Sequence, residues 1–350
     1  MNAKEDNICA ALHGKKDLRL DRCPIPEPND EEVQINIKHC GVCGTDQHIW
    51  RDGEIGGGNL TYPHIIGHEA AGIITKVGAK VTNLKIGDRV AVEAVVPCYK
   101  CHVCTSGSYN LCGSRALRGT VHGVGLLTRY TVCSHYSCFR LPDTLSTEVG
   151  AMMEPLAVTV RACERSQLQV GETVLVCGSG TIGMMVLQVV KACGARSVCV
   201  TDISPYRLQL ATKLGADHTI NVSGLSSKEA AAQIKQTVGG TIDVSFECVG
   251  NDPAIATAIY ATRSGGRMVM IGIPSGNSEV PLSDAVLREV SIIPTVAYVN
   301  SYPIAISLAE QGKVDVTSLI SHRLPLERVI EAFETKNEAS PEELKCMIHI

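Results

Sequence analysis

The amino-terminal part of the chain alternates hydrophobic and polar positions with the two-residue period that is typical of β-strands. Residues 33–37 alternate in this way, and residues 70–77 and 88–96 are again strand-like. Prolines and glycines separate these segments, which indicates turns rather than long helices. We therefore predict a mostly β domain over residues 1–153.

Farther along the chain the period changes, and short apolar runs alternate with helical segments. Apolar runs predict strands at residues 172–177, 197–201, 217–222, 242–248 and 267–273. Helical patterns lie between them, at residues 184–192 and 227–238 and in segments that begin near residues 204 and 252. Repeated β–α units indicate a parallel, doubly wound sheet, so residues 154–297 are predicted to form an α/β domain.

The first β–α turn of this region contains Gly178, Gly180 and Gly183 in the spacing G-x-G-x-x-G. The motif follows a predicted strand, precedes a helix and has Asp202 at the end of the next strand, which completes a dinucleotide-binding fingerprint. The glycines let the backbone approach a pyrophosphate, and the helix N-terminus, which starts near Ile182, offers N–H groups to it. The Asp202 carboxylate favours NAD because it binds ribose hydroxyls and repels a 2′-phosphate. Arg207 keeps NADP as an alternative, since an arginine could balance that phosphate.

Composition narrows the range of functions. Of 350 residues, 45% are hydrophobic and 19% are charged, with a net charge of −4, so the sequence shows no basic excess. This balance argues against a nucleic-acid partner and against a polybasic membrane patch. No uncharged apolar run approaches the ~20 residues that span a bilayer, and the first residues lack the apolar core of a signal peptide. We therefore expect no nucleic acid, no membrane association and a cytoplasmic location.

Sixteen cysteines are many for such a chain, and in the cytosol they indicate metal binding or free thiols. The strongest single signal is the spacing C-x2-C-x2-C-x7-C, formed by Cys98, Cys101, Cys104 and Cys112. Four thiolates can surround a tetrahedral ion without leaving an open position, which is the pattern of a structural zinc. The alternative is a chance cluster or a redox switch.

A second candidate metal site lies upstream of these cysteines. Cys43, His68 and Glu69 offer a thiolate, an imidazole and a carboxylate. Three protein ligands with one open position describe a catalytic zinc rather than a structural one. From these residues alone, the alternative is a buried cysteine and a core histidine that do not meet.

Along essentially its whole length, the sequence resembles the zinc-dependent medium-chain dehydrogenases and, within them, the sorbitol (polyol) dehydrogenase branch. The resemblance implies a GroES-like catalytic domain made of residues 1–153 and 298–350, with a Rossmann domain inserted at residues 154–297. It also implies NAD, two zinc ions per chain, one catalytic and one structural, and a homotetramer (or homodimer).

The resemblance assigns roles to individual residues. Cys43, His68 and Glu69 match the catalytic zinc positions, and the four clustered cysteines match the structural zinc. Glu154 stands where alcohol dehydrogenases place a second zinc cysteine, and in the polyol branch this glutamate lies beside the metal and its water. The positions that match NAD contacts are Ile182, Asp202, Arg207, and the backbone at Ile271, Gly272, Ile273, Thr295, Val296 and Ala297.

The expected substrate pocket departs from the polyol branch. Ile49 stands where a tyrosine is usual, and Ala297 stands where an arginine is usual, just before the retained Tyr298. Two polar groups that would bind sugar hydroxyls are therefore missing, which weakens discrimination for sorbitol. We expect oxidation of a polyol-like secondary alcohol to its ketone, with a cyclitol, an amino alcohol or a phosphorylated polyol as alternatives.

The expected chemistry is hydride transfer to the nicotinamide, with zinc as the Lewis acid. The proton is expected to leave through Thr45 toward His48, or through water beside Glu154. His48 as an ordinary surface histidine, and Thr45 as a residue that only holds a turn, are the alternatives. Asp46 is expected to fix the loop or a metal ligand. The rivals from other classes are a non-catalytic zinc- and NAD-binding protein and a cysteine-rich redox sensor.

Overall fold

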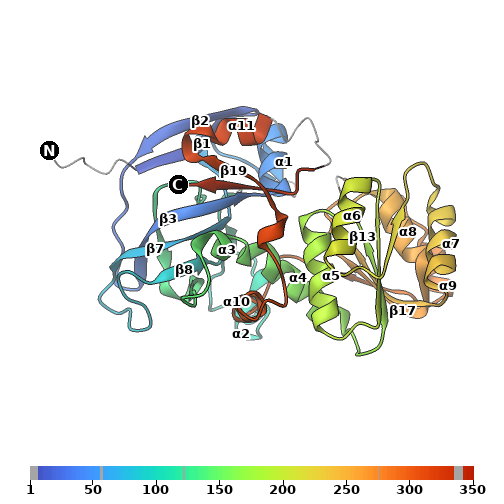
Figure 1. The fold of residues 1–350 in the computed structure, drawn as a ribbon. Coiled ribbons are helices and arrows are strands. Elements are labelled where there is room, and N and C mark those ends of the chain that lie inside the picture. Colours follow the sequence, from blue (N-terminus) through green and yellow to red (C-terminus); the bar gives the residue numbers. More distant parts are fainter. Residues whose placement is uncertain (1–6, 56–57, 121–122, 275, 335–341) are drawn as a thin grey trace. The chain divides into compact units, whose positions relative to one another are not determined.

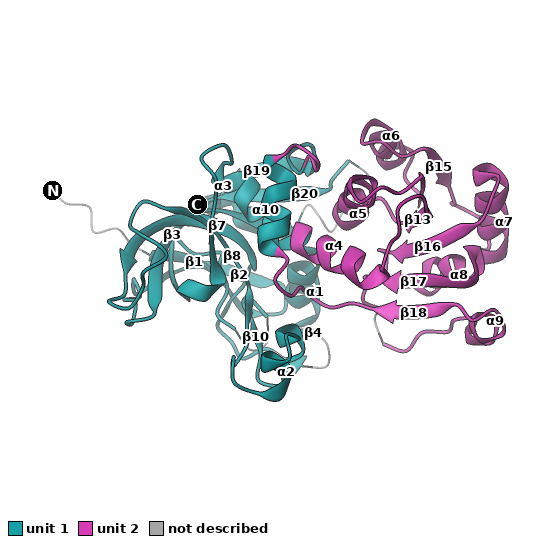
Figure 2. Cartoon of the chain, turned by 90° about the horizontal axis from the view of Figure 1, so that it is seen from below, with its two compact units in different colours: residues 1–155, 302–310, 316–350 teal, residues 156–301, 311–315 magenta. Residues whose placement is uncertain are grey.

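The structure, a computed structural model, describes residues 7–55, 58–120, 123–274, 276–334 and 342–350 (Figure 1). The chain divides into two compact units (Figure 2). Unit 1 contains Met1–Pro155, Tyr302–Glu310 and Val316–Ile350, and unit 2 contains Leu156–Ser301 and Gln311–Asp315. Within the described ranges, no helix has both the length and the apolar character needed to cross a membrane.

The described residues of unit 1 form a seven-stranded sheet in the order β12-β8-β7-β3-β20-β19, with β11 also paired to β3. Its strands are β3 (Glu32–Val42), β7 (Glu69–Val77), β8 (Arg89–Val92), β11 (Tyr130–Ser134), β12 (Cys138–Arg140), β19 (Ile320–Pro325) and β20 (Lys345–His349). β3 is central because it pairs antiparallel with β7, β11 and β20. Its alternating Val33, Ile35 and Ile37 are fully buried, as the two-residue period predicts.

Smaller elements complete unit 1. The additional strands are β1 (Asn7–Gly14), β2 (Asp17–Cys23), β4 (Glu54–Ile55), β5 (Gly58–Asn59), β6 (His64–Ile65), β9 (Val95–Val96) and β10 (Ala116–Leu117). The helices are α1 (Gly44–Asp52), α2 (His102–Thr105), α3 (Thr147–Ala151), α10 (Tyr302–Glu310) and α11 (Val329–Glu334), with 3-10 turns η1 (Tyr109–Leu111), η2 (His135–Ser137), η3 (Thr317–Leu319) and η4 (Leu326–Arg328). Trp50 of α1 packs on Phe333 of α11 with ring centroids 6.1 Å apart, so both helices close the same core.

The described part of unit 2 contains a six-stranded parallel sheet in the order β15-β14-β13-β16-β17-β18. The strands are β13 (Thr173–Cys177), β14 (Ser197–Asp202), β15 (His218–Asn221), β16 (Ile242–Glu247), β17 (Thr262–Met270) and β18 (Ser291–Pro294). The helices are α5 (Thr181–Ala192), α6 (Pro205–Lys213), α7 (Ser227–Val238), α8 (Asp252–Ala261) and α9 (Leu282–Leu287), and α4 (Met153–Ser166) precedes the sheet. The strand order reverses between β13 and β16, where doubly wound sheets bind their ligands.

The helix ends of unit 2 follow their local sequence signals. Ser226 and Glu229 form a capping box at the start of α7, and Gly239 ends this helix with a left-handed φ of 65°. Ser204 accepts a hydrogen bond from the Arg207 N–H and begins α6, with Pro205 at its first position. The predicted α/β alternation is therefore confirmed.

α5 begins at Thr181 with Gly180 as its N-cap, next to the helix start predicted near Ile182. The predicted bounds of β17 were wrong. β17 begins at Thr262 rather than near residue 267 and ends at Met270. Gly265 and Gly266 suggested a turn, but they lie within this strand.

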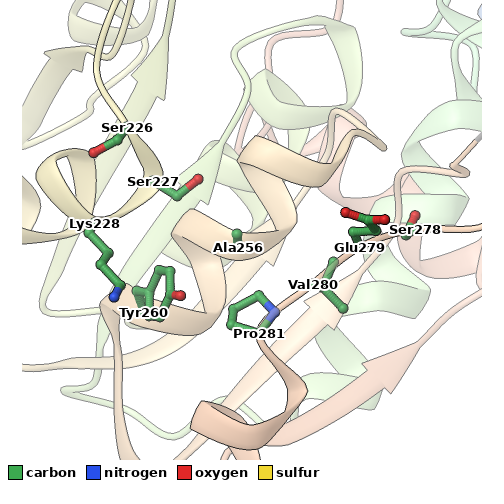
Figure 3. Close-up of a pocket in the computed structure, with 9 residues that line it drawn as sticks. All are labelled: Ser226, Ser227, Lys228, Ala256, Tyr260, Ser278, Glu279, Val280 and Pro281. Carbon is green, nitrogen blue, oxygen red and sulfur yellow. The ribbon is translucent and has the colours of Figure 1, made fainter.

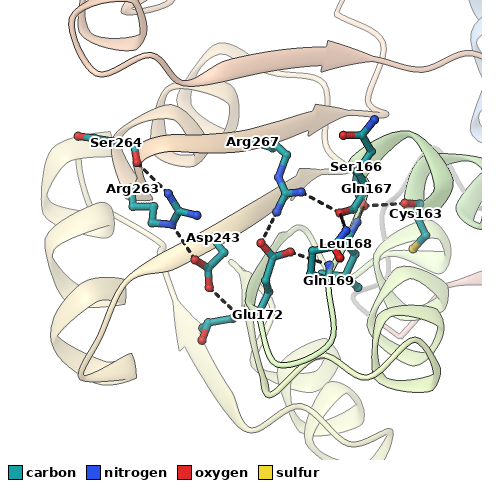
Figure 4. A network of polar contacts seen from close by, with 11 residues as sticks. Cys163, Ser166, Gln167, Leu168, Gln169, Glu172, Asp243, Arg263, Ser264 and Arg267 are labelled. Carbon is teal, nitrogen blue, oxygen red and sulfur yellow. Dashed lines mark hydrogen bonds and ion pairs between the residues drawn. The ribbon is translucent and has the colours of Figure 1, made fainter.

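A polar network supports the amino ends of the unit 2 strands (Figure 4). Asp243 accepts hydrogen bonds from the Thr173 N–H at 2.9 Å and from Arg263 Nε at 2.7 Å. Glu172 pairs with Arg267, which also donates to the Gln167 carbonyl at 2.8 Å. These contacts leave the opposite, carboxyl edge of the sheet to carry the predicted cofactor residues.

Candidate catalytic and cofactor sites

Asp46 ties together the two segments that carry the candidate catalytic ligands. Its Oδ2 accepts a hydrogen bond from the Cys43 N–H at 2.9 Å, and its Oδ1 accepts one from the Gly67 N–H at 3.2 Å. Oδ1 also lies 3.2 Å from Nδ1 of His68. Asp46 is fully buried in the first turn of α1, and Cys43 is the N-cap residue of that helix. Asp46 therefore fixes the loop, as the sequence analysis expected.

Three candidate ligands meet at this place. The ligand atoms of Cys43, His68 and Glu69 all lie within 4.8 Å of one another. β7 begins at Glu69, and its register with β3 sets Glu69 opposite Gly41, close to Cys43. A thiolate, an imidazole and a carboxylate at this separation fit a zinc ion with an open position. The structure thus brings together the residues that the sequence analysis grouped.

Negative groups surround the His68 ring. Burial alone lowers the pKa of His68, but the Asp46 carboxylate and the Cys43 thiolate outweigh it and raise this pKa well above 6.5. Burial raises the pKa of Asp46, yet His68 and the Cys43 N–H outweigh burial and hold it below its ordinary value. The site therefore favours positive charge, which suits a divalent cation.

Lys345 is a residue of this site that sequence reasoning missed. Its Nζ donates to both Glu69 carboxylate oxygens, at 2.6 and 2.7 Å, and to the Val42 carbonyl at 3.3 Å. Burial lowers the pKa of Lys345, but the charges of Glu69 and Cys43 outweigh it and raise this pKa. Lys345 lies 276 positions from Glu69, so no local motif could have connected the two residues.

The close approach of Glu69 also depends on Gly41. A methyl group on Gly41 would overlap Oε2 of Glu69. The glycine is required here for space, because the carboxylate lies directly against the backbone of β3.

The predicted proton-transfer residues have different environments. The His48 side chain is 54% exposed, and its Nδ1 lies 2.9 Å from Nη2 of Arg51 and 3.6 Å from Oδ2 of Asp52. This geometry favours the alternative in which His48 is a surface histidine. Thr45 is half-buried in the first turn of α1. Glu154 is buried at the start of α4, and its charge contributes to the raised pKa of Lys345.

The two predicted apolar and aromatic substrate residues are packed inside the protein. Ile49 is fully buried and belongs to the hydrophobic core of unit 1. Tyr298 is likewise fully buried. The observed role of Ile49 is therefore core packing, and contact of either side chain with substrate stays a prediction.

The four clustered cysteines form a compact group in unit 1. Their ligand atoms lie within 4.8 Å of one another, and the Sγ atoms of Cys101 and Cys104 are 3.5 Å apart. The Cys98–Cys104 and Cys101–Cys112 Sγ pairs are each 3.9 Å apart. A tetrahedral zinc with ~2.3 Å bonds to sulfur requires sulfur pairs about 3.8 Å apart. The backbone N–H groups of Lys100 and Cys101 lower the pKa of Cys98 to about 6, which favours its thiolate. These residues fit a structural zinc.

The glycine-rich turn of unit 2 has the geometry that its motif predicts. Gly178 has a φ of 93°, which a residue with a side chain adopts only with strain. A methyl group on Gly183 would overlap the Gly178 carbonyl oxygen, so this position needs glycine for helix–strand packing. Gly180 caps α5 and has open space where its side chain would be. Asp202 accepts hydrogen bonds from the N–H groups of Ser179 at 2.7 Å and Ser204 at 2.9 Å.

A cavity of about 410 Å³ lies at the carboxyl ends of β13 and β14. Gly178, Gly180, Asp202 and Arg207 all line it, so four predicted cofactor residues share one cavity. Glycine backbone, the start of α5 and an acidic residue are the groups that bind a dinucleotide. The residues present therefore fit NAD.

The remaining predicted cofactor residues follow the neighbouring strands. Ile182 is half-buried in the first turn of α5. Ile271, Gly272 and Ile273 come directly after β17, and Thr295, Val296 and Ala297 come directly after β18. The N–H groups of Ile271 and Gly272 donate to the Glu247 carbonyl, and that of Thr295 donates to the Met270 carbonyl. These segments therefore begin at the same carboxyl edge of the sheet.

Another hollow of about 650 Å³ lies on unit 2, lined partly by Ser226, Lys228, Tyr260 and Pro281 (Figure 3). The Lys228 ammonium lies 5.6 Å from the centre of the Tyr260 ring. None of the predicted site residues lines this hollow.

Fold and sites together define a zinc-binding dehydrogenase. The model of the alcohol dehydrogenase GroES-like domain matches residues 29–143, and the model of the zinc-binding dehydrogenase matches residues 181–311. The chain belongs to this family and is an oxidoreductase. The predicted fold class, a GroES-like domain with a Rossmann domain, is thereby confirmed.

Individual relatives cover almost the whole chain. The chain is 43% identical to the sorbitol dehydrogenase of Homo sapiens over 95% of its length and 93% of that protein. It is 41% identical to the sorbitol dehydrogenase of Gallus gallus, over 99% of this chain and 98% of that one. Among solved structures, 2R,3R-butanediol dehydrogenase from Bacillus subtilis has a TM-score of 0.89 at 30% identity, covering 98% of this chain and 99% of that one. L-idonate 5-dehydrogenase from Escherichia coli has a TM-score of 0.91 at 26% identity, covering 99% and 98%.

Proposed function

We propose that this protein transfers a hydride between a polyol-like secondary alcohol and NAD, giving the ketone, with a catalytic zinc held by Cys43, His68 and Glu69. The observation that carries the proposal is the meeting of these three ligand atoms within 4.8 Å, in a chain of the zinc-binding dehydrogenase family. A zinc ion at such a site acts as a Lewis acid and favours loss of the alcohol proton near neutral pH.

The residues around the ligands prepare this site. Asp46 contacts Nδ1 of His68 and so orients the imidazole for a ligand on its other nitrogen. Lys345 holds the Glu69 carboxylate and adds a positive charge close to it. The buried Glu154 carboxylate is the group that we assign to proton transfer, because His48 lies exposed between Arg51 and Asp52.

Cofactor choice follows from the charge in the cavity of unit 2. Asp202 is fixed there by the N–H groups of Ser179 and Ser204, so its carboxylate cannot turn away without losing both hydrogen bonds. A fixed negative charge disfavours the 2′-phosphate of NADP. Arg207 lines the same cavity and reduces this preference without reversing it.

The relatives support a class of substrate, the secondary alcohols, but not one particular compound. Those described above are named for sorbitol, 2R,3R-butanediol and L-idonate, all of which carry secondary hydroxyls. The sequence has Ile49 and Ala297 where the polyol branch usually has polar residues, so we propose a polyol-like secondary alcohol without assigning sorbitol as the substrate. A cyclitol, an amino alcohol and a phosphorylated polyol are the alternatives.

The experiment is a substrate screen with zinc-replete protein. Polyols, cyclitols, amino alcohols and phosphorylated polyols are each supplied with NAD, and NADH absorbance is followed. We expect turnover of at least one secondary alcohol and little with primary alcohols. Absence of turnover in every case, with two zinc ions bound, would contradict the proposal and favour the non-catalytic alternative.

The assembly and location are also proposed. A homotetramer, or a homodimer, is what the sequence resemblance supports, and sedimentation equilibrium measures it directly. The proposed cytoplasmic location is tested by following a tagged copy of the protein in cell fractions.

A further inference from the structure

Two histidines face each other across neighbouring strands of unit 1. His39 of β3 and His349 of β20 are direct partners in the antiparallel register. Their ring centroids are 4.6 Å apart, and Nε2 of His39 lies 3.1 Å from Nδ1 of His349. Opposed residues of an antiparallel pair keep their side chains on the same face, so the sheet itself brings the two imidazoles together.

Glu148 of α3 adds a carboxylate to this pair. Its Oε1 lies 3.8 Å from Nε2 of His349, and the ligand atoms of His39, Glu148 and His349 all lie within 4.8 Å of one another. We propose that these three residues form a further metal site, which binds a divalent transition-metal ion such as Zn²⁺. Two imidazoles and one carboxylate are a ligand set that zinc accepts, with its remaining position left to water.

The groups behind the ligands are arranged as in metal sites. Nδ1 of His39 lies 2.9 Å from the Thr147 hydroxyl, which leaves Nε2 directed at His349. Arg323 donates to both oxygens of Glu148, at 2.7 and 3.2 Å, and so fixes the carboxylate. A partner on the far nitrogen of a ligating histidine is typical of metal sites and sets the orientation of the ring.

Nearby positive charges limit the strength of the site. The Arg323 guanidinium and the Lys38 ammonium act on this cluster and oppose a cation. His349 is also half-exposed, with 46% of its side chain accessible. We therefore expect reversible binding, weaker than that of the four-cysteine group. The bound ion would join β3, α3 and β20, three segments that are far apart in the sequence, and would stabilise unit 1 against unfolding.

The test uses full-length protein that already holds its two zinc ions. Zinc chloride is titrated in chelator-free buffer, and calorimetry, equilibrium dialysis and thermal unfolding are measured. We expect one additional equivalent of zinc per chain and a rise in Tm.

Variants of the cluster test which residues bind this zinc. His349→Gln and Glu148→Gln should lose the additional equivalent. His322→Gln changes an exposed histidine of β19 outside the cluster and should retain it. His39→Asn should also lose it, but its partly buried position makes the exposed His349 the decisive variant if the former does not fold.

The outcomes are separable from those for the catalytic reaction, since none of these readouts is enzyme activity. Failure of the wild type to bind an additional equivalent would overturn the proposal, as would unchanged binding by His349→Gln.

Discussion

The Lys345 ammonium lies 2.6 and 2.7 Å from the two carboxylate oxygens of Glu69, and both side chains are almost completely removed from solvent. Charges this deeply buried are costly unless they are paired and hydrogen-bonded. Lys345 satisfies Glu69 from one side, and Glu69 is also a proposed zinc ligand. With the proposed zinc bound, the carboxylate would have two cationic partners, the Lys345 ammonium and the metal ion.

Removing Lys345 should show how much the stability of the protein depends on the ion pair between Lys345 and Glu69. Lys345→Met leaves the Glu69 carboxylate buried without its partner, and we expect the zinc-free protein to lose about 3–5 kcal/mol in the free energy of unfolding. The double variant Lys345→Met with Glu69→Gln should recover much of that loss, because no uncompensated charge remains. Urea unfolding of the wild type, both single variants and the double variant measures the coupling. If Lys345→Met and the double variant lost the same free energy of unfolding, the unpaired Glu69 charge would not be the cause of the loss.

Asp46→Asn tests the orienting contact on His68. The amide keeps the size of the side chain but removes its charge, and we expect zinc affinity or kcat/KM to fall about 10–100-fold. Zinc content after dialysis and steady-state kinetics give the two values. Asp52→Asn, on the exposed side of the same helix, is the matched control and should change neither.

The four-cysteine group should hold its own metal independently of the catalytic one. Cys101→Ser is expected to reduce the zinc content from two ions to one and to lower Tm, because residues around the group lose the ion that organises them. Cys43→Ser should also leave one zinc but should abolish turnover with a smaller change in Tm. Cys193→Ser removes an exposed thiol outside both groups and should retain both ions. A protein that keeps two zinc ions after Cys101→Ser would contradict this assignment.

Asp202→Ala addresses the choice of cofactor. Without the carboxylate, a 2′-phosphate is no longer repelled and Arg207 remains in the same cavity, so the ratio of kcat/KM for NAD to that for NADP should decrease. The change also removes the acceptor for the Ser179 and Ser204 N–H groups, so NAD turnover itself should decline. A wild-type preference for NADP would refute the assignment of NAD.

The buried Glu93 predicts a pH dependence of the free energy of unfolding. Burial raises its pKa from 4.5 to about 7, although a hydrogen bond from the Tyr109 hydroxyl at 2.7 Å lowers it in part. Because the folded protein binds this proton more tightly than the unfolded chain does, its contribution to stability is present below pH 4.5 and is lost as the pH rises toward 7. Glu93→Gln should remove that decline and stabilise the protein at pH 8 by about 3 kcal/mol. Urea unfolding at pH 5 and at pH 8 tests this, and an equal effect of the substitution at both values would contradict it.

The parts of the sites that the sequence predicted are those whose evidence is local. The cysteine spacing from Cys98 to Cys112 and the glycine spacing from Gly178 to Gly183 each lie within one short segment, and one ion or one turn determines each pattern. Cys43 and His68 are farther apart, and their proposed partnership came from ligand chemistry and resemblance. The structure shows that the two segments are joined through the Asp46 carboxylate, which accepts hydrogen bonds from the Cys43 and Gly67 N–H groups.

What the sequence could not predict depends on long-range strand pairing. Lys345 meets Glu69, and His349 meets His39, only because β20 pairs with β3. A lysine or histidine in a short apolar strand carries no signal for its partner. The early start of β17 was missed for a different reason. Gly265 and Gly266 lie at an irregularity in its pairing with β16, where the register passes from Ile242–Thr262 to Val244–Arg267, and Gly265 has a left-handed φ of 67°.

The position of β20 also bears on the order in which the molecule is made. Ribosomes synthesise Cys43, His68 and Glu69 early, but Lys345 emerges only after the entire sequence of unit 2 has been translated. Until then the Glu69 carboxylate lacks its buried partner and β3 lacks one of its neighbouring strands. Unit 2 can thus fold before β20 has been synthesised. We therefore expect the surroundings of Glu69 to be completed only after unit 2 has been translated.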